Sequence, residues 1–196
     1  MGGSPRHCEA ANRGLIESVE TKHNGGLSWG EACLSAARLC SGFGAVVSVS
    51  GIRGTGKTQA ATVCSLIACM LGGTCYHITG FSMLEQIKQG FGGEGLRVSD
   101  LTRHDGRLGQ IDLLTIDECD KAFSTDWGLG ILSEVVDGRY CAGLPTILVS
   151  NLEPSEFKER FGRHIARRIN EAGGWVEFME PIPGGGADGK GVKHYG

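Results

Sequence analysis

The stretch Gly51-Ile52-Arg53-Gly54-Thr55-Gly56-Lys57-Thr58 decides the fold of this chain. It matches the pattern G-x-x-x-x-G-K-[S/T] in full and lies between an apolar, β-branched run at residues 45–50 and a helix-favouring segment at residues 57–71. The glycines let the backbone turn tightly, so that successive N–H groups and the N-terminus of the next helix point at a phosphate. The stretch therefore predicts a phosphate-binding loop, or P-loop.

Two side chains of this loop carry its chemistry. We expect Lys57 to reach the β- and γ-phosphates and Thr58 to offer its hydroxyl to Mg²⁺, a small ion that prefers oxygen ligands. The candidate nucleotide-binding residues are Gly51, Ile52, Arg53, Gly54, Thr55, Gly56, Lys57 and Thr58. A chance glycine loop with an exposed lysine would not account for the flanking strand and helix.

A second apolar run, residues 113–116, ends in two carboxylates, Asp117 and Glu118. Ligands of open α/β sheets bind at the carboxyl ends of the strands, which is where these carboxylates would lie. We expect Asp117 to hold Mg²⁺ through its water shell and Glu118, which faces differently, to accept a hydrogen bond from the attacking water. In isolation, the same residues are also typical of a strand followed by a solvated acidic turn with Cys119 and Asp120.

Two later segments are also candidates. Asn151 follows the apolar run 144–150, where it would touch the γ-phosphate or the water, although an asparagine after a strand is by itself more often a turn residue. The segment 156–169 gathers five basic residues against two acidic ones. Such a helix can hold a nucleic-acid backbone or offer an arginine to a neighbouring subunit's γ-phosphate. It is also typical of a solvated face with Ile165 and Ile169 packed inward.

The remaining apolar runs alternate with helical segments, which predicts an α/β fold. Strands are expected at residues 45–50, 75–79, 113–117, 146–150 and 175–178. Helices are expected at residues 28–41, 57–71, 82–89, 98–107 and 127–140, and two more within 154–171. Parallel neighbours need long crossovers, so the pattern indicates a P-loop NTPase with a five-stranded parallel sheet sandwiched by helices and no separate lid domain.

Composition narrows the function classes. A formal net charge of −3 argues against a protein that binds nucleic acid over its whole surface, because phosphate binding needs clustered Lys and Arg. The eight cysteines include no Cys-x-x-Cys pair, so we expect buried, reduced thiols. No apolar run reaches membrane length and no signal peptide opens the chain, which predicts a cytoplasmic protein. We expect an irregular lead-in at residues 1–28, an ATPase domain at 29–180 and a disordered, glycine-rich tail at 181–196.

The order of these motifs resembles the helicase loaders of the DnaC type and the transposition helper ATPases of the IstB type. The resemblance covers about residues 28–178 and includes Val136-Asp137-Gly138-Arg139-Tyr140 and Ser150-Asn151-Leu152. It implies an AAA+ module of the ASCE class, with ATP and Mg²⁺ as cofactors and each active site completed by an adjacent subunit. The implied roles are nucleotide and metal binding for Lys57, Thr58 and Asp117, water polarisation for Glu118, a sensor at Asn151, and an arginine finger in trans at Arg168, with Arg167 as its competitor.

The function that the resemblance implies is that of a Mg-dependent ATPase in DNA replication, which binds a DnaB-like replicative helicase and single-stranded DNA. A compact module of this kind suits a phage and would then act in the host cytoplasm. Two alternatives stay open: an IstB-like transposition helper, and a nucleotide-gated binding module with little turnover. The second gains from the absence of any arginine after Arg168, where relatives carry another nucleotide sensor. A small-molecule kinase is disfavoured by the Asp117-Glu118 pair and Asn151.

Overall fold

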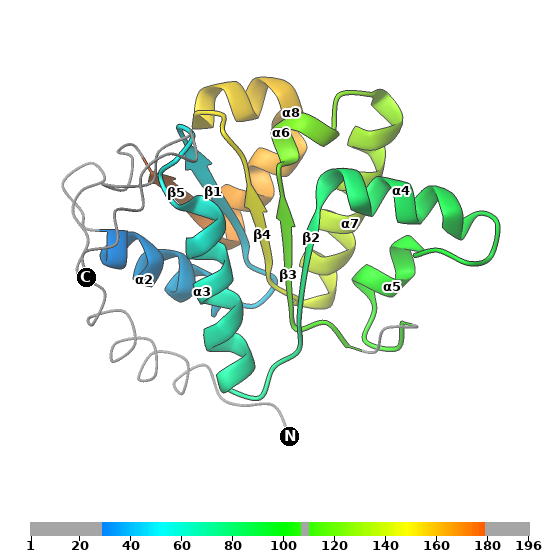
Figure 1. Ribbon diagram of the computed structural model, residues 1–196, viewed down its shortest axis with the longest axis horizontal. Coiled ribbons are helices and arrows are strands. Elements are labelled where there is room, and N and C mark those ends of the chain that lie inside the picture. The colour runs from blue at the N-terminus through cyan, green and yellow to red at the C-terminus, as the bar shows by residue number, and fades with distance from the viewer. Residues whose placement is uncertain (1–28, 107–109, 179–196) are drawn as a thin grey trace, which may run out of the picture.

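Five strands form one parallel sheet in the order β2-β3-β4-β1-β5 in a computed structural model that describes residues 29–106 and 110–178 (Figure 1). All four pairings are parallel. The strands are β1 (Val46–Gly51), β2 (Cys75–Thr79), β3 (Leu113–Asp117), β4 (Thr146–Val149) and β5 (Gly174–Phe178). The predicted five-stranded parallel sheet is confirmed, with strand ends that differ from the expected ones by a single residue at most.

The helices are α2 (Trp29–Cys40), α3 (Lys57–Met70), α4 (Gly80–Gly90), α5 (Val98–Thr102), α6 (Cys119–Ala122), α7 (Asp126–Ala142) and α8 (Pro154–Ala172). The two helices expected within 154–171 are the halves of α8, which Gly162 separates with a φ of 81° and a ψ of 166°. The helix expected at 98–107 is shorter than predicted, because the backbone at Arg103 is extended. The short helix α6 was not predicted.

Helices cover both faces of the sheet, and the apolar side chains of its strands pack in two clusters, one on each face. On β1, Val46 packs in a cluster with residues of α4, α7 and α8, whereas Val47 and Val49 pack in a second cluster with residues of α2 and α3. Figure 1 shows α3 on one side of the sheet and α7 on the other. This arrangement confirms the predicted sandwich and leaves the carboxyl ends of the strands on one edge, as parallel strands require.

Seven of the eight cysteines lie within the described residues, and all seven are free thiols. Cys33, Cys64 and Cys119 are buried, as expected, but Cys69 and Cys141 are exposed, so the prediction of uniformly buried cysteines was wrong. Both exposed cysteines lie at the carboxyl-terminal ends of helices, where side chains reach solvent.

The predicted lead-in, 1–28, and the predicted tail, 181–196, lie outside the described residues. Among the helices that the structure describes, none has both the length and the hydropathy needed to cross a bilayer.

Candidate functional site

The P-loop joins the end of β1 to the start of α3. Gly51, Gly54 and Gly56 all have positive φ, at 122°, 80° and 82°. At Gly51 a Cβ atom would lie 2.1 Å from the carbonyl oxygen of Phe178 on the neighbouring strand, so this position admits no side chain. The glycine spacing in the sequence therefore reflects both the backbone conformation and the closeness of β5.

The start of α3 is open to an anion. Gly56 is the N-cap residue and offers no side chain to the first N–H groups of the helix. Helix N-termini normally satisfy these groups with a capping side chain, and those without one favour a phosphate. Ile52, Arg53 and Gly54 form the exposed rim of the loop, and the Thr55 hydroxyl donates a 2.9 Å hydrogen bond to the carbonyl of Ile52.

Lys57 is folded into this loop and is 6% exposed. Its Nζ donates to the carbonyl oxygens of Gly51, at 2.8 Å, and Ile52, at 2.5 Å. Burial lowers the pKa of Lys57, and the charges of Asp120 and Asp117 oppose that shift. An ammonium whose hydrogen bonds go to neutral carbonyls in a partly desolvated loop is well suited to pair with phosphate oxygens.

Thr58 and Asp117 meet at the expected metal position. The Thr58 hydroxyl donates a 2.8 Å hydrogen bond to Asp117 Oδ2, and Asp117 Oδ1 accepts one of 2.7 Å from the backbone N–H of Glu118. His77 Nε2 lies 3.7 Å from Asp117 Oδ2. Burial alone would raise the pKa of Asp117, but hydrogen bonds from His77, Thr58 and the Glu118 N–H outweigh it and lower the pKa.

These donors fit Mg²⁺, which commonly takes one or two protein oxygens and completes its shell with phosphate oxygens and water. Among the described residues there is no cluster of three or more His, Cys, Asp or Glu side chains arranged for a metal. A metal held by Thr58 and Asp117 would thus depend on a bound triphosphate for further ligands.

Glu118 is the only non-glycine residue with positive φ among the described residues, at φ 55° and ψ 38°. Left-handed backbone costs about 1–2 kcal/mol for such a residue. It turns the chain between Asp117 and α6, where the Asp117 carboxylate contacts Thr58 and the Glu118 carboxylate contacts Lys121. The Glu118 carboxylate, which is 41% exposed, forms an ion pair with Lys121 one turn along α6.

Asn151 lies just after β4 and is held by Asp120. The two oxygens of Asp120 accept hydrogen bonds from the backbone N–H and from Nδ2 of Asn151, both at 3.1 Å. From the sequence we predicted a role for Asn151 at the γ-phosphate, whereas Asp120 was expected only in a solvated acidic turn. The signal that could have found it is a third carboxylate three positions after Asp117, on the first turn of a helix.

Arg168 is paired within its own chain. Its Nε lies 2.9 Å from Asp137 Oδ1, its Nη1 lies 3.4 Å from Glu171 Oε2, and its guanidinium stacks 4.2 Å from the ring centre of Tyr140. Its side chain is 20% exposed, whereas that of Arg167 is 69% exposed. Its three partners lie on α7 and α8, and none of them belongs to the P-loop.

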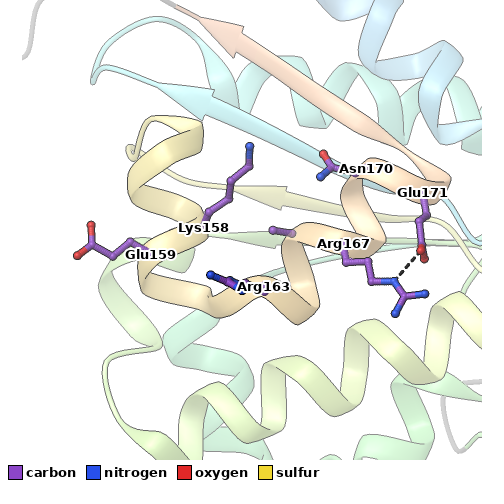
Figure 2. A pocket seen from close by; sticks show the side chains of 7 residues that line it. Lys158, Glu159, Arg163, Arg167, Asn170 and Glu171 are labelled. Atoms are coloured by element: carbon purple, nitrogen blue, oxygen red, sulfur yellow. Dashed lines mark hydrogen bonds and ion pairs between the residues drawn. The ribbon is translucent and has the colours of Figure 1, made fainter.

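A hollow of about 510 Å³ opens beside this region of α8, where Gly162 interrupts the helix (Figure 2). It is lined by Lys158, Glu159, Arg163, Ala166, Arg167, Asn170 and Glu171. Arg167 pairs with Glu171 across one turn. The basic helix predicted from the sequence therefore exposes three cations around a concave surface, and its apolar residues Ile165 and Ile169 are buried.

No family model matches the chain. It is 26% identical over 130 residues to the replicative helicase loader DnaC of Buchnera aphidicola subsp. Acyrthosiphon pisum (strain APS), a match that covers 66% of this chain and 52% of that protein. The crystal structure of a DnaC helicase loader superposes with a TM-score of 0.64 at 17% identity, over 86% of this chain and 98% of the other. The replication initiator DnaA bound to AMPPCP and single-stranded DNA superposes with a TM-score of 0.56 at 17% identity, over 91% and 47%.

The chain spans about half the length of the curated relative that it matches. Its fold is that of the AAA+ P-loop NTPase domains of these solved structures, and the resemblance to DnaC-type proteins that the motifs indicated is confirmed.

Proposed function

We propose that this AAA+ module binds ATP with Mg²⁺ at the P-loop and hydrolyses it, with residues 29–180 as the ATPase domain. The observation that carries the proposal is the contact between Thr58 and Asp117, which brings a hydroxyl and a carboxylate together beside Lys57 at the ends of two parallel strands. This donor set matches what a Mg-triphosphate requires from a P-loop enzyme.

Each residue has a defined task in this reaction. Lys57 exchanges the carbonyls of Gly51 and Ile52 for phosphate oxygens, so its charge offsets that of the triphosphate. Thr58 and Asp117 hold the Mg²⁺, which supplies further positive charge to the phosphate oxygens.

Glu118 is the proposed base that orients and polarises the attacking water, and its left-handed backbone aims it away from Asp117. To act, its carboxylate leaves the ion pair with Lys121, which is partly exposed and therefore weak. Asn151 is the proposed sensor of the γ-phosphate and of that water. Hydrolysis in phosphoryl transfer depends on positioning and charge stabilisation of this kind.

We further propose that the chain is a replication factor of the helicase-loader type, which acts on a replicative helicase and on single-stranded DNA in the cytoplasm. The match to a replicative helicase loader over 130 residues supports the helicase, and the fold shared with an initiator bound to AMPPCP and single-stranded DNA supports the nucleotide and the DNA. The exposed side chains of Lys158, Arg163 and Arg167 gather around one hollow of α8. Such a confined basic surface is compatible with DNA binding by a chain whose net charge is −3.

Self-assembly completes the proposal, with Arg168 reaching the γ-phosphate of an adjacent subunit. Asp137 of α7 holds the guanidinium of Arg168, and exposed ion pairs of this kind contribute little to stability. Exchanging one anion for another at an interface is therefore inexpensive, and the pairing keeps the guanidinium ordered until a partner arrives.

The proposal is tested with the purified chain in two steps. Mg-dependent hydrolysis of ATP is measured with and without single-stranded and duplex DNA of equal length, beside Lys57→Ala as a control without the phosphate-binding charge. In the second step, the chain is used to capture its partners from a native lysate, once with and once without a slowly hydrolysed ATP analogue. Recovery of a replicative helicase supports a loader, recovery of a transposase supports the transposition helper, and tight ATP binding without turnover supports the nucleotide-gated module.

A further inference from the structure

Asp120 pairs with Asn151, which lies 31 residues later in the sequence, and so links the segments that follow β3 and β4. It lies on the first turn of α6, three residues beyond the end of β3, and both of its carboxylate oxygens accept hydrogen bonds from Asn151, which follows the neighbouring strand β4. The bonds go to the backbone N–H and to the side-chain amide of the same residue, so Asp120 fixes both where Asn151 lies and how its side chain is turned.

We propose that Asp120 is a positioning residue that sets the orientation of the Asn151 carboxamide for ATP hydrolysis. This inference rests on the proposed function. A carboxylate only accepts hydrogen bonds, whereas a carboxamide has one donor end and one acceptor end. Asp120 therefore selects the orientation in which Nδ2 of Asn151 faces it and Oδ1 faces away.

The selected orientation has a chemical consequence. With one Nδ2 proton engaged by Asp120, the amide keeps a second proton for a phosphate oxygen and an acceptor oxygen for a water proton. Without Asp120 the carboxamide of Asn151 can turn over, so that its NH₂ group faces the phosphate in only part of the molecules. Preorganised donors are what make such sites effective in stabilising developing charge.

Asp120 is itself held on a rigid support. Cys119, the residue before it, is fully buried and its thiol donates a 3.2 Å hydrogen bond to the carbonyl of Ile116. Helix α6 also packs closely on α4: a Cβ atom added at Gly80 of α4 would lie only 2.6 Å from the Cβ atom of Ala122 on α6. A positioning group must be fixed in this way to hold its partner.

Asp120 also lies near the nucleotide loop. It lies three residues after Asp117, whose carboxylate accepts a hydrogen bond from the hydroxyl of Thr58 in the P-loop. The clamp between Asp120 and Asn151 is thus part of the P-loop end of the sheet, and its loss should be felt in turnover.

The test is a double-mutant cycle on ATP hydrolysis with Asp120→Ala, Asn151→Ala and the double variant. We expect each single substitution to lower kcat by about 10- to 100-fold, the usual range for residues that orient a catalytic group. Since Asp120 acts through Asn151, the double variant should be no slower than Asn151→Ala alone. Affinity for a fluorescent ATP analogue should change by only about two- to threefold, because Lys57 and Thr58 remain in place.

Two variants keep the test decisive. Asp120→Asn has the same size but accepts only one of the two hydrogen bonds, so it should reproduce the loss of kcat even where the alanine variant folds poorly. Asp126→Asn, an exposed acid at the start of α7, should hydrolyse ATP at the wild-type rate. In NMR spectra of the folded chain, the side-chain amide protons of Asn151 should shift in Asp120→Asn and not in Asp126→Asn.

The outcomes separate the two proposals. Losses that add in the double variant, or Asn151 amide signals unchanged by Asp120→Asn, would overturn the clamp while leaving the ATPase in place. A folded wild-type chain that hydrolyses no ATP would overturn the proposed function and, with it, any role of Asp120 in turnover.

Discussion

The hydroxyl of Thr58 lies 2.8 Å from Asp117 Oδ2, although the two residues are 59 positions apart in the chain. The second oxygen of Asp117 is held by the N–H of Glu118. Both oxygens of the carboxylate are therefore oriented by the protein itself, and its lowered pKa keeps it ionised at neutral pH. A metal that binds here meets two ligands that are already in position.

Replacing Thr58 tests this metal site. We expect Thr58→Ala to weaken ATP binding by about 10- to 100-fold when Mg²⁺ is present and to have little effect in EDTA, because only the metal contact is lost. Thr58→Ser keeps the hydroxyl and should bind nearly as the wild type. The affinity of each variant and of the wild type is measured by titration with a fluorescent nucleotide, once with Mg²⁺ and once in EDTA. An equal loss with and without Mg²⁺ would show that Thr58 supports the loop and not the metal.

Glu118 should separate binding from hydrolysis. Glu118→Gln keeps the shape of the side chain but cannot take a proton, so turnover should fall by about 10²- to 10⁴-fold while Mg-ATP still binds. Lys121→Ala removes the partner of the ion pair and should leave turnover within a few fold of the wild type, because Glu118 is then free. If Glu118→Gln hydrolyses ATP at the normal rate, Glu118 is only a turn residue.

Arg139 should matter for stability, because it is fully buried. Its guanidinium donates to Thr146 Oγ1 and to the carbonyls of Leu101, Ile111 and Pro145 at 2.7–3.0 Å, and burial lowers its pKa to about 10, so it stays charged at neutral pH. We expect Arg139→Met to lower the free energy of unfolding by about 3 kcal/mol or more, since several buried carbonyls lose their donor.

Urea unfolding of the two chains measures this difference. Arg139→Lys, which keeps a charge with fewer donors, should fall between the wild type and Arg139→Met. A loss below about 0.5 kcal/mol, the range of ordinary surface substitutions, would contradict the role of Arg139 as a buried link between β4, α5 and the loop before β3.

The sequence predicted the parts of this molecule that depend on local pattern. The glycine spacing of the P-loop, the five apolar strands and the carboxylates after Leu114-Thr115-Ile116 are each readable within a few residues, because strand propensity and the P-loop conformation are local properties. The alternation of strands and helices then determined the parallel sheet.

The contacts that complete the site could not be predicted in this way. The pairing of Asp120 with Asn151, and of Asp137 with Arg168, joins residues 31 positions apart whose side chains meet only when neighbouring elements pack. Helix α6 follows from the left-handed turn at Glu118, a conformation that no local propensity favours for glutamate. Arg139 looks like a surface residue by type, and only the packing of α7 shows that it is buried.

Asp137 should contribute stability in a pH-dependent way. Burial alone would raise its pKa, but hydrogen bonds from His164 and Arg168 outweigh burial and lower it. A lowered pKa in the folded state gives stability that is present above the unfolded value, about 3.9, and is lost as the pH falls through the folded value. We therefore expect Asp137→Asn to lower the free energy of unfolding by about 1 kcal/mol or less at pH 7, and by progressively less as the pH falls below the unfolded value, as measured by urea unfolding. A cost that stays constant down to pH 2 would assign it to packing.

Arg168 should act on turnover and in trans. Arg168→Ala is expected to bind ATP nearly as the wild type but to hydrolyse it about 10³-fold or more slowly, because a finger stabilises charge that develops in the transition state. Arg167→Ala is the matched control, since Arg167 is the adjacent arginine, is more exposed and pairs with Glu171. It should retain most of the activity.

Mixing two inactive chains tests whether the arginine serves a neighbour. Lys57→Ala chains cannot bind ATP but still offer Arg168, whereas Arg168→Ala chains bind ATP but offer no finger. Mixed interfaces should therefore recover part of the wild-type hydrolysis, in proportion to the fraction of interfaces with an intact P-loop facing an intact Arg168. Asp137→Asn, which releases Arg168 from its own chain, should preserve this complementation, because the finger needs the partner's phosphate and not Asp137. If co-assembled mixtures stay inactive, Arg168 has no role in trans; and if Arg167→Ala is the variant that complements Lys57→Ala, the finger is Arg167.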